Sequence, residues 1–155
     1  MAIYINKKIV FRCDVSKSVG YGHLTRCISI AEKLEKKYSY KIYFIINKNK
    51  FIKKKFLNKR FKFFFINEKL RYEDKIITEI LSKYEIKSIF FDVKKNYPTK
   101  FFNDLKKNKI KTITIDDKYK KRINCDLCFY PPVPQVKKFN WSKFKGKKFI
   151  GWQYI

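Results

Sequence analysis

Short apolar runs alternate with amphipathic stretches along most of the chain. The runs 8–13, 41–47, 61–66, 88–92, 111–115 and 126–130 are rich in β-branched and aromatic residues and predict six strands. Apolar residues recur at helical spacing in 23–38, 72–84 and 98–107, and a lysine-rich stretch around 51–57 predicts a short further helix. Strands that alternate with helices favour right-handed crossovers and a mostly parallel sheet. The pattern therefore predicts one Rossmann-like α/β domain over residues 1–155.

Local signals support the boundaries of these elements. In the first helix, Leu24, Cys27, Ala31 and Leu34 fall on one face, as expected for a helix packed on a sheet. Pro98 suits the first turn of the third helix, and the prolines of 131–134 end the sixth strand. The remaining stretch, 135–148, is basic and shows no periodicity, so it is predicted to be irregular.

Composition adds an unusual charge. The 155 residues include 39 Lys and Arg against 13 Asp and Glu, a formal net charge of +26. Such a charge is typical of proteins that bind nucleic acid or anionic membranes. The lysines are scattered, however, and accompany many Ile, Asn, Phe and Tyr, the residues of A/T-rich codons. Compositional drift is therefore the favoured interpretation and nucleic acid an unfavoured partner, although a functional basic surface remains the alternative.

The same sequence bears on location and metals. No apolar run is long enough to span a bilayer, and Lys7-Lys8 interrupts the N-terminus too early for a signal peptide, so a cytoplasmic location is expected. Cys125 and Cys128 have the spacing of a zinc hook, but the chain has one histidine and no second such pair. We expect four buried thiols (Cys13 and Cys27 are the others), no disulfide, no metal and no cofactor.

Chemically useful residues gather where the predicted strands end. Asp14 follows the first strand, Asp92 ends the fourth, and Asp116 and Asp117 follow the fifth. Ligands of open parallel sheets bind outside these carboxyl ends. Aspartate is also common there simply because it favours turns.

A glycine loop lies between the first strand and the first helix. Gly20 and Gly22 allow close backbone approach, and the helix that follows offers free N–H groups to an anion. The loop is neither a dinucleotide fingerprint, because Thr25 stands at the third glycine position, nor a P-loop. His23, at the helix start, is expected to stay neutral and could act as a general base. It could equally cap the helix or pack under the loop.

A longer pattern resembles a known family. It begins with Phe11-Arg12-x-Asp14 and Gly20-x-Gly22-His23-x-x-Arg26-Cys27, followed by Ala31; weaker matches are Asp92, Ile115-Asp116-Asp117, Cys125-Asp126 and Gly151-x-x-Tyr154. It is similar to the opening of the UDP-2,4-diacetamido-2,4,6-trideoxy-β-L-altropyranose hydrolases of pseudaminic acid synthesis. Spore-coat polysaccharide proteins and other glycosyltransferases of the GT-B fold share the glycine-loop and histidine theme.

The resemblance implies a fold and a reaction. It implies the N-terminal lobe of a two-lobed GT-B enzyme that acts on a UDP-activated amino sugar without metal or cofactor. The residue matching His23 would activate a water that attacks the anomeric carbon and expels UDP. The implied substrate-binding residues are Asp14, Gly20, Tyr21, Gly22, Arg26, Asp92 and Asp117.

The chain also departs from that family. Val93-Lys94 stands where the family has a bulkier pair, and Tyr130-Pro131-Pro132 replaces an expected Asn. The second lobe is not in this sequence, so we expect another chain or a continuation to supply it. The leading hypothesis is a nucleotide-sugar hydrolase lobe. The alternatives are a glycosyltransferase lobe, with an acceptor hydroxyl in place of water, and a non-catalytic basic module that binds nucleic acid.

Overall fold

A computed structural model describes residues 7–16, 20–48, 52, 60–67 and 71–154. Its centre is a seven-stranded sheet with all neighbouring strands parallel, in the order β3-β2-β1-β4-β5-β6-β7. The strands are β1 (Lys8–Cys13), β2 (Lys41–Lys48), β3 (Lys62–Asn67), β4 (Ser88–Asp92), β5 (Lys111–Ile115), β6 (Leu127–Tyr130) and β7 (Lys147–Ile150). This arrangement confirms the predicted Rossmann-like α/β class.

Helices connect the strands. They are α1 (Gly22–Tyr38), α2 (Glu73–Lys83), α3 (Thr99–Lys107) and the short α4 (Pro134–Lys137), with 3₁₀ turns η2 (Lys120–Asn124) and η3 (Trp152–Tyr154). The six predicted strands and three longer predicted helices lie within one residue of the observed bounds. The prediction that 135–148 is irregular was wrong, since α4 lies there and β7 begins there. The helix predicted at 51–57 lies outside the described residues, apart from residue 52.

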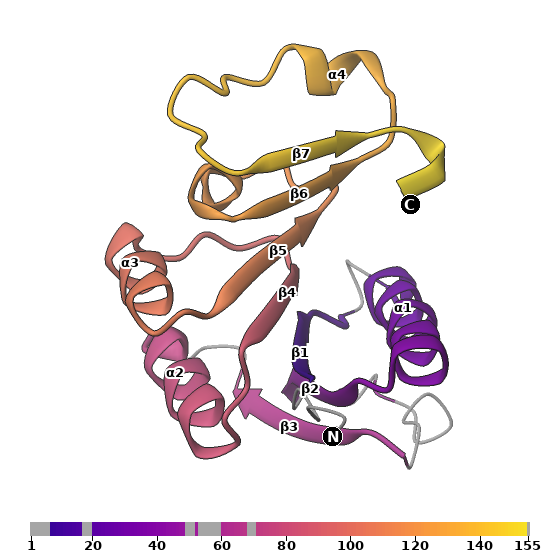
Figure 1. Cartoon of the computed structure of the whole chain (residues 1–155), viewed down its shortest axis with the longest axis vertical. Coiled ribbons are helices and arrows are strands. Elements are labelled where there is room, and N and C mark those ends of the chain that lie inside the picture. Colours follow the sequence, from indigo (N-terminus) through magenta and orange to yellow (C-terminus); the bar gives the residue numbers. More distant parts are fainter. Residues whose placement is uncertain (1–6, 17–19, 49–51, 53–59, 68–70, 155) are drawn as a thin grey trace, which may run out of the picture.

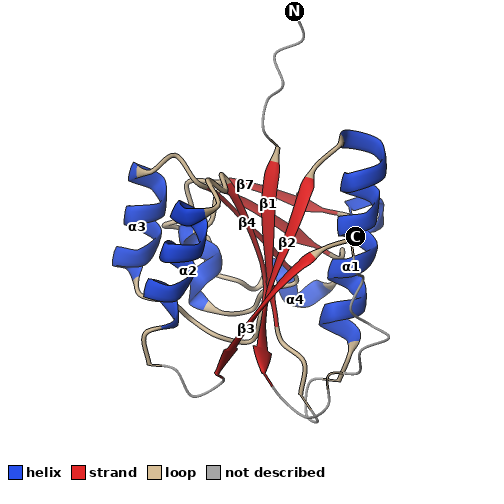
Figure 2. Ribbon diagram, turned by 90° about the horizontal axis from the view of Figure 1, so that it is seen from below, coloured by secondary structure: helices blue, strands red, loops and turns tan. Residues whose placement is uncertain are grey.

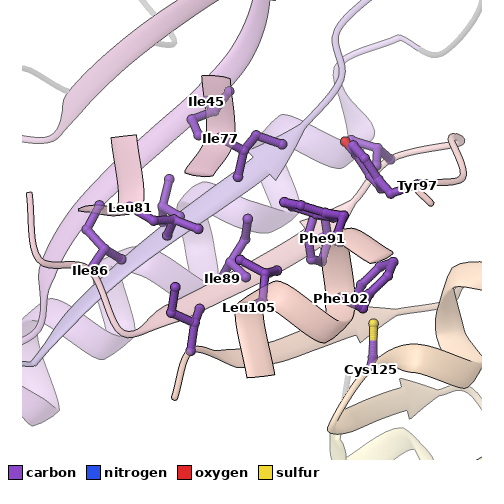
Figure 3. Packing of buried hydrophobic residues seen from close by; sticks show 14 of the residues in the cluster. Ile45, Ile77, Leu81, Ile86, Ile89, Phe91, Tyr97, Phe102, Leu105 and Cys125 are labelled. Atoms are coloured by element: carbon purple, nitrogen blue, oxygen red, sulfur yellow. The ribbon is translucent and has the colours of Figure 1, made fainter. Parts of the chain in front are cut away.

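The helices cover both faces of the sheet. Figures 1 and 2 show α1 on one face and α2 with α3 on the other. Because side chains alternate along a strand, Phe11 packs on the α1 side with Leu24 and Cys27, while Val10 packs on the other side. Figure 3 shows that second side, where Ile77 of α2 is among the residues that pack around Phe91. The two cores hold the strand ends in fixed positions.

Three helix-to-strand turns share one geometry. The residues after α1, α2 and α3 include Ser39, Glu85 and Lys109, with φ of 57°, 53° and 55°. In all three turns the next amide, that of Tyr40, Ile86 or Ile110, bonds back to a carbonyl near the end of the helix, at 3.3, 2.8 and 2.9 Å. Such left-handed helix endings usually use glycine. None of the three has it, so each keeps some backbone strain.

The strand order reverses between β1 and β4. From β1 the chain crosses to β2 and β3 on one side, and from β4 it continues through β5 to β7 on the other. The crossovers therefore diverge and leave a crevice at the carboxyl ends of β1 and β4. Open α/β sheets bind their ligands at such a switch point.

Candidate functional site

An open pocket of about 800 Å³ lies beside this switch point. Its size is within the range of small-molecule sites, roughly 300–1,000 Å³. The first turn of α1, the ends of β4 and β5, and the segment after β6 form its walls. The lining residues are Gly22, His23, Arg26, Asp92, Val93, Lys94, Ile115, Asp116, Asp117, Lys118, Tyr119, Val133, Gln135, Val136 and Phe139.

His23 and Asp92 form the central contact of the pocket. The His23 Nδ1 atom lies 2.5 Å from Asp92 Oδ1 and 3.0 Å from the Asp92 carbonyl oxygen. Arg26 donates two hydrogen bonds to the same carboxylate, from Nε to Oδ2 at 2.9 Å and from Nη2 to Oδ1 at 2.7 Å. Asp92 is only 2% exposed. A single buried carboxylate therefore fixes two side chains of α1.

The protonation state of this pair follows from Asp92. Burial alone would raise the pKa of Asp92, but the hydrogen bonds from His23 and Arg26 and the charge of Arg26 outweigh it, so the pKa is lowered. An ionised carboxylate can only accept, so His23 Nδ1 carries the proton and donates it to Asp92. In the neutral imidazole the lone pair is then on Nε2. No described residue bonds to Nε2, so that nitrogen is available as a base.

A backbone hydrogen bond holds the chain just before His23. After β1, Gly20 adopts φ of 69° and its N–H donates to the Ser16 carbonyl at 2.7 Å. The helix α1 begins two residues later at Gly22. No described side chain caps it, and its first turn contains no acidic residue. The N–H groups of the first turn of α1 are therefore open to an anionic ligand, beside the carboxylate of Asp92 that already faces His23 and Arg26.

Asp117 has a different environment from Asp92. Its Oδ1 accepts hydrogen bonds from the Tyr119 N–H at 3.0 Å and from Lys121 Nζ at 2.8 Å. Lys121, itself 1% exposed, also donates to the Val93 carbonyl at 2.7 Å. Burial raises the pKa of Asp117 against the opposing effect of Lys121. Together Asp117 and Lys121 tie the end of β5 to the end of β4 beneath the pocket.

Asp14 belongs to a second ionic cluster, outside the pocket. Arg12 donates from Nη1 to Asp14 at 2.6 Å and from Nε to Glu73 of α2 at 2.6 Å. Lys95 and Tyr97 complete the bonds to Glu73, each at 2.5 Å. Burial tends to raise the pKa of Glu73, but the bonds from Arg12, Lys95 and Tyr97 outweigh it and lower the pKa to about 2. This cluster joins β1 to α2.

The structure brings some of the predicted site residues together. Gly22, His23, Arg26, Asp92 and Asp117 line the pocket. Asp14, Gly20 and Tyr21 are not among its lining residues.

Two features of the site had no clear sequence signal. Lys121 is one of many lysines in the sequence, so its burial under the pocket could not be read from its type. Phe139 lies in the tail predicted to be irregular, yet it lines the pocket wall. The sequence did indicate Asp116 as a candidate site residue, because it directly follows a predicted strand. It is exposed on the pocket rim with φ of 47°.

All four cysteines are buried and free. Cys125 and Cys128 donate weakly to the carbonyls of Lys121 and Arg122, at 3.5 and 3.4 Å. Burial raises the pKa of both thiols, that of Cys128 to about 12. Metal ligation requires thiolates, which these surroundings disfavour. Within the described ranges no three His, Cys, Asp or Glu side chains group in a way that could hold a metal ion.

The chain was compared with known proteins at the level of sequence. No protein-family model matches it, and no curated protein matches it either. Among the described helices, none has the length and apolar character needed to cross a membrane.

Proposed function

We propose that this domain is the sugar-side lobe of a nucleotide-sugar hydrolase in which His23 is the general base. The observation that carries the proposal is the contact of His23 Nδ1 with ionised Asp92 at the sheet's switch point, which leaves Nε2 of this pocket-lining histidine with no hydrogen bond to a described residue. A carboxylate that orients an imidazole in this way is a recurrent arrangement for proton abstraction. The resemblance of the segment around His23 to the altropyranose hydrolases implies the same role for the histidine.

The proposed reaction is a substitution at the anomeric carbon coupled to one proton transfer. A water oxygen attacks the anomeric carbon of the sugar while His23 Nε2 takes one of the water protons. The bond between the anomeric carbon and the β-phosphate oxygen breaks, and its electron pair leaves with UDP. The products are the free sugar and UDP, and the imidazolium of His23 then loses its proton to solvent. Asp92 stabilises that imidazolium while it lasts.

Groups that can bind an anion lie at the pocket beside its three aspartates, and they support an anionic leaving group. The uncapped start of α1 faces the pocket, and Lys94 and Lys118 are exposed on its rim. Arg26 is less available, because both of its hydrogen bonds to Asp92 are already made. Developing charge on a diphosphate is stabilised by such fixed dipoles and cations. In the proposal, a second lobe from the same or another chain supplies the contacts to uridine.

The first test measures binding and turnover together. Titration calorimetry with UDP-N-acetylglucosamine and with UDP reports binding, and a coupled assay of UDP release reports hydrolysis. His23→Asn should lower the rate of UDP release about 10²–10⁴-fold and leave the affinity nearly unchanged. Equal turnover by wild type and His23→Asn would exclude the catalytic role. These measurements use the chain paired with its second lobe, and absence of any binding of UDP or UDP-N-acetylglucosamine by that pair would overturn the nucleotide-sugar assignment itself.

Product analysis separates this proposal from its close alternative. Free sugar together with UDP is the hydrolase outcome. A glycosylated acceptor, formed at the expense of free sugar when candidate hydroxyl compounds are added, would reassign the same site to a transferase.

A further inference from the structure

The edge of the sheet opposite the pocket is strongly basic. In a parallel sheet all strands start at one edge, and here the connecting helices end at that edge too (Figure 2). Five of the strands, β1, β2, β3, β5 and β7, begin with lysine. We call this surface the amino edge, and its exposed lysines are Lys7, Lys36, Lys37, Lys41, Lys62, Lys83, Lys87, Lys106, Lys107, Lys109, Lys111, Lys145 and Lys147.

Few acidic groups offset this charge. Glu85, Glu35 and Asp126 lie at the amino edge, and Asp104 lies in the last turn of α3. The first three already face a cation: Glu85 is 3.2 Å from Lys8, Glu35 is 3.3 Å from Arg60, and Asp126 is 3.9 Å from Lys111. The exposed lysines therefore project an uncompensated positive field.

The amino edge is also broad and held in shape. At about 4.8 Å between neighbouring strands, its seven strands spread over roughly 29 Å. The turns at Ser39, Glu85 and Lys109 repeat the same left-handed helix ending. These turns fix the backbone positions of the lysines that belong to them. A field spread over such a width suits an extended anionic surface better than one small ligand.

We propose that the amino edge docks the protein on an anionic lipid bilayer. Nucleic-acid sites typically add arginine forks and stacking aromatic rings to their charge. Here the exposed cations are lysines, apart from Arg60, which faces Glu35. Tyr38, the last residue of α1 and 46% exposed, is of the type that settles at membrane interfaces. Lysines act there as point charges that need no specific partner geometry.

This orientation has a consequence for the pocket. The pocket lies at the carboxyl ends of the strands, at the other edge of the sheet. Docking through the amino edge therefore leaves the pocket open to the aqueous side. This inference does not depend on the proposed function, because it uses none of the pocket residues.

Vesicle flotation tests the proposal with a matched pair of variants. The edge variant is Lys37→Gln, Lys87→Gln, Lys107→Gln and Lys145→Gln combined. The control is Lys100→Gln, Lys120→Gln, Lys137→Gln and Lys138→Gln, which removes the same number of charges elsewhere. Vesicles are phosphatidylcholine alone or an equimolar mixture with phosphatidylglycerol, at about 150 mM salt.

The wild-type protein should float with the anionic vesicles and not with the neutral ones. Each lysine near an anionic surface contributes about fivefold to the partition constant, so the loss of four should lower the partition constant of the edge variant by roughly several hundredfold. The control variant should stay within about threefold of wild type. Equal losses in both variants, or no flotation of wild type, would overturn the proposal. So would tighter binding to short duplex DNA that the edge variant alone abolishes.

Discussion

The two edges of the sheet use charge in opposite ways. At the carboxyl edge the buried acids are held by cations: Asp92 by Arg26, Glu73 by Arg12 and Asp117 by Lys121. At the amino edge, exposed lysines stand mostly without acids. Buried pairs act through fixed geometry and resist salt, whereas an exposed field acts at a distance and is screened within about 10 Å. The same lysine-rich composition thus gives two different edges. At the carboxyl edge, cations fix the positions of buried acids, and at the amino edge, exposed lysines attract anions.

The largest expected effect comes from breaking the pair at the pocket. Asp92→Asn removes the charge that holds His23 Nδ1–H, so the imidazole can take the other tautomer and lose its basic Nε2. We expect UDP release to fall about 10³–10⁴-fold. Asp116→Asn, on the rim of the same pocket, is the control. Its rate of UDP release should fall less than tenfold. If both variants lose the same activity, the orienting role of Asp92 is wrong.

The Glu73 cluster makes stability depend on pH. The folded pKa is about 2, against an ordinary 4.5, so folding favours the ionised form. Its contribution is fully present above pH 4.5 and is lost as the pH falls toward 2. The shift corresponds to about 3 kcal/mol. Urea unfolding between pH 6 and 2 should show this loss.

The variant Glu73→Gln isolates the contribution of Glu73 to the pH dependence of stability. Glu73→Gln leaves Arg12 buried with one partner fewer, so the free energy of unfolding at pH 7 should drop by about 3–5 kcal/mol. The remaining stability of the variant should then change less between pH 4.5 and 2 than that of wild type. If the free energy of unfolding of the two proteins falls in parallel as the pH is lowered, other carboxylates cause the loss of stability in acid. Glu79→Gln, on the exposed side of the same helix, is the matched control.

The sequence predicted the fold better than the site. Strands such as β4 are short, apolar and buried, so their composition alone identifies them. Strand β7 was missed because three of its four residues, Lys147, Lys148 and Ile150, are exposed. It pairs with β6 through the backbone, as in the register of Leu127 with Lys147. Backbone pairing of this kind leaves no apolar period in the sequence.

The site shows where local patterns stop being informative. Asp14 and Asp92 both follow or end a strand, and the sequence treats them alike. Arg12, two residues before Asp14, turns that carboxylate into part of the α2 cluster. Asp92 instead meets His23 and Arg26 because the crossover of α1 brings the helix start over β4. Which aspartate joins the pocket is decided by contacts that form only in the fold, those of Arg12 with Glu73 and of Asp92 with His23 and Arg26.

The smallest expected effect concerns the backbone at the amino edge. Lys109 has φ of 55° after α3, a conformation that costs a non-glycine residue energy. Lys109→Gly should therefore raise the free energy of unfolding by about 0.5–1 kcal/mol, measured by urea denaturation at neutral pH. Lys106→Gly, within the helix, should lower it by up to about 1 kcal/mol. Both variants lose one lysine of the amino edge, so both should lose anionic-vesicle binding equally, about fivefold. Opposite stability changes with equal binding losses would show that the turn sets the shape of the amino edge while charge alone sets its affinity. A larger binding loss in Lys109→Gly would instead make the left-handed turn part of the docking surface.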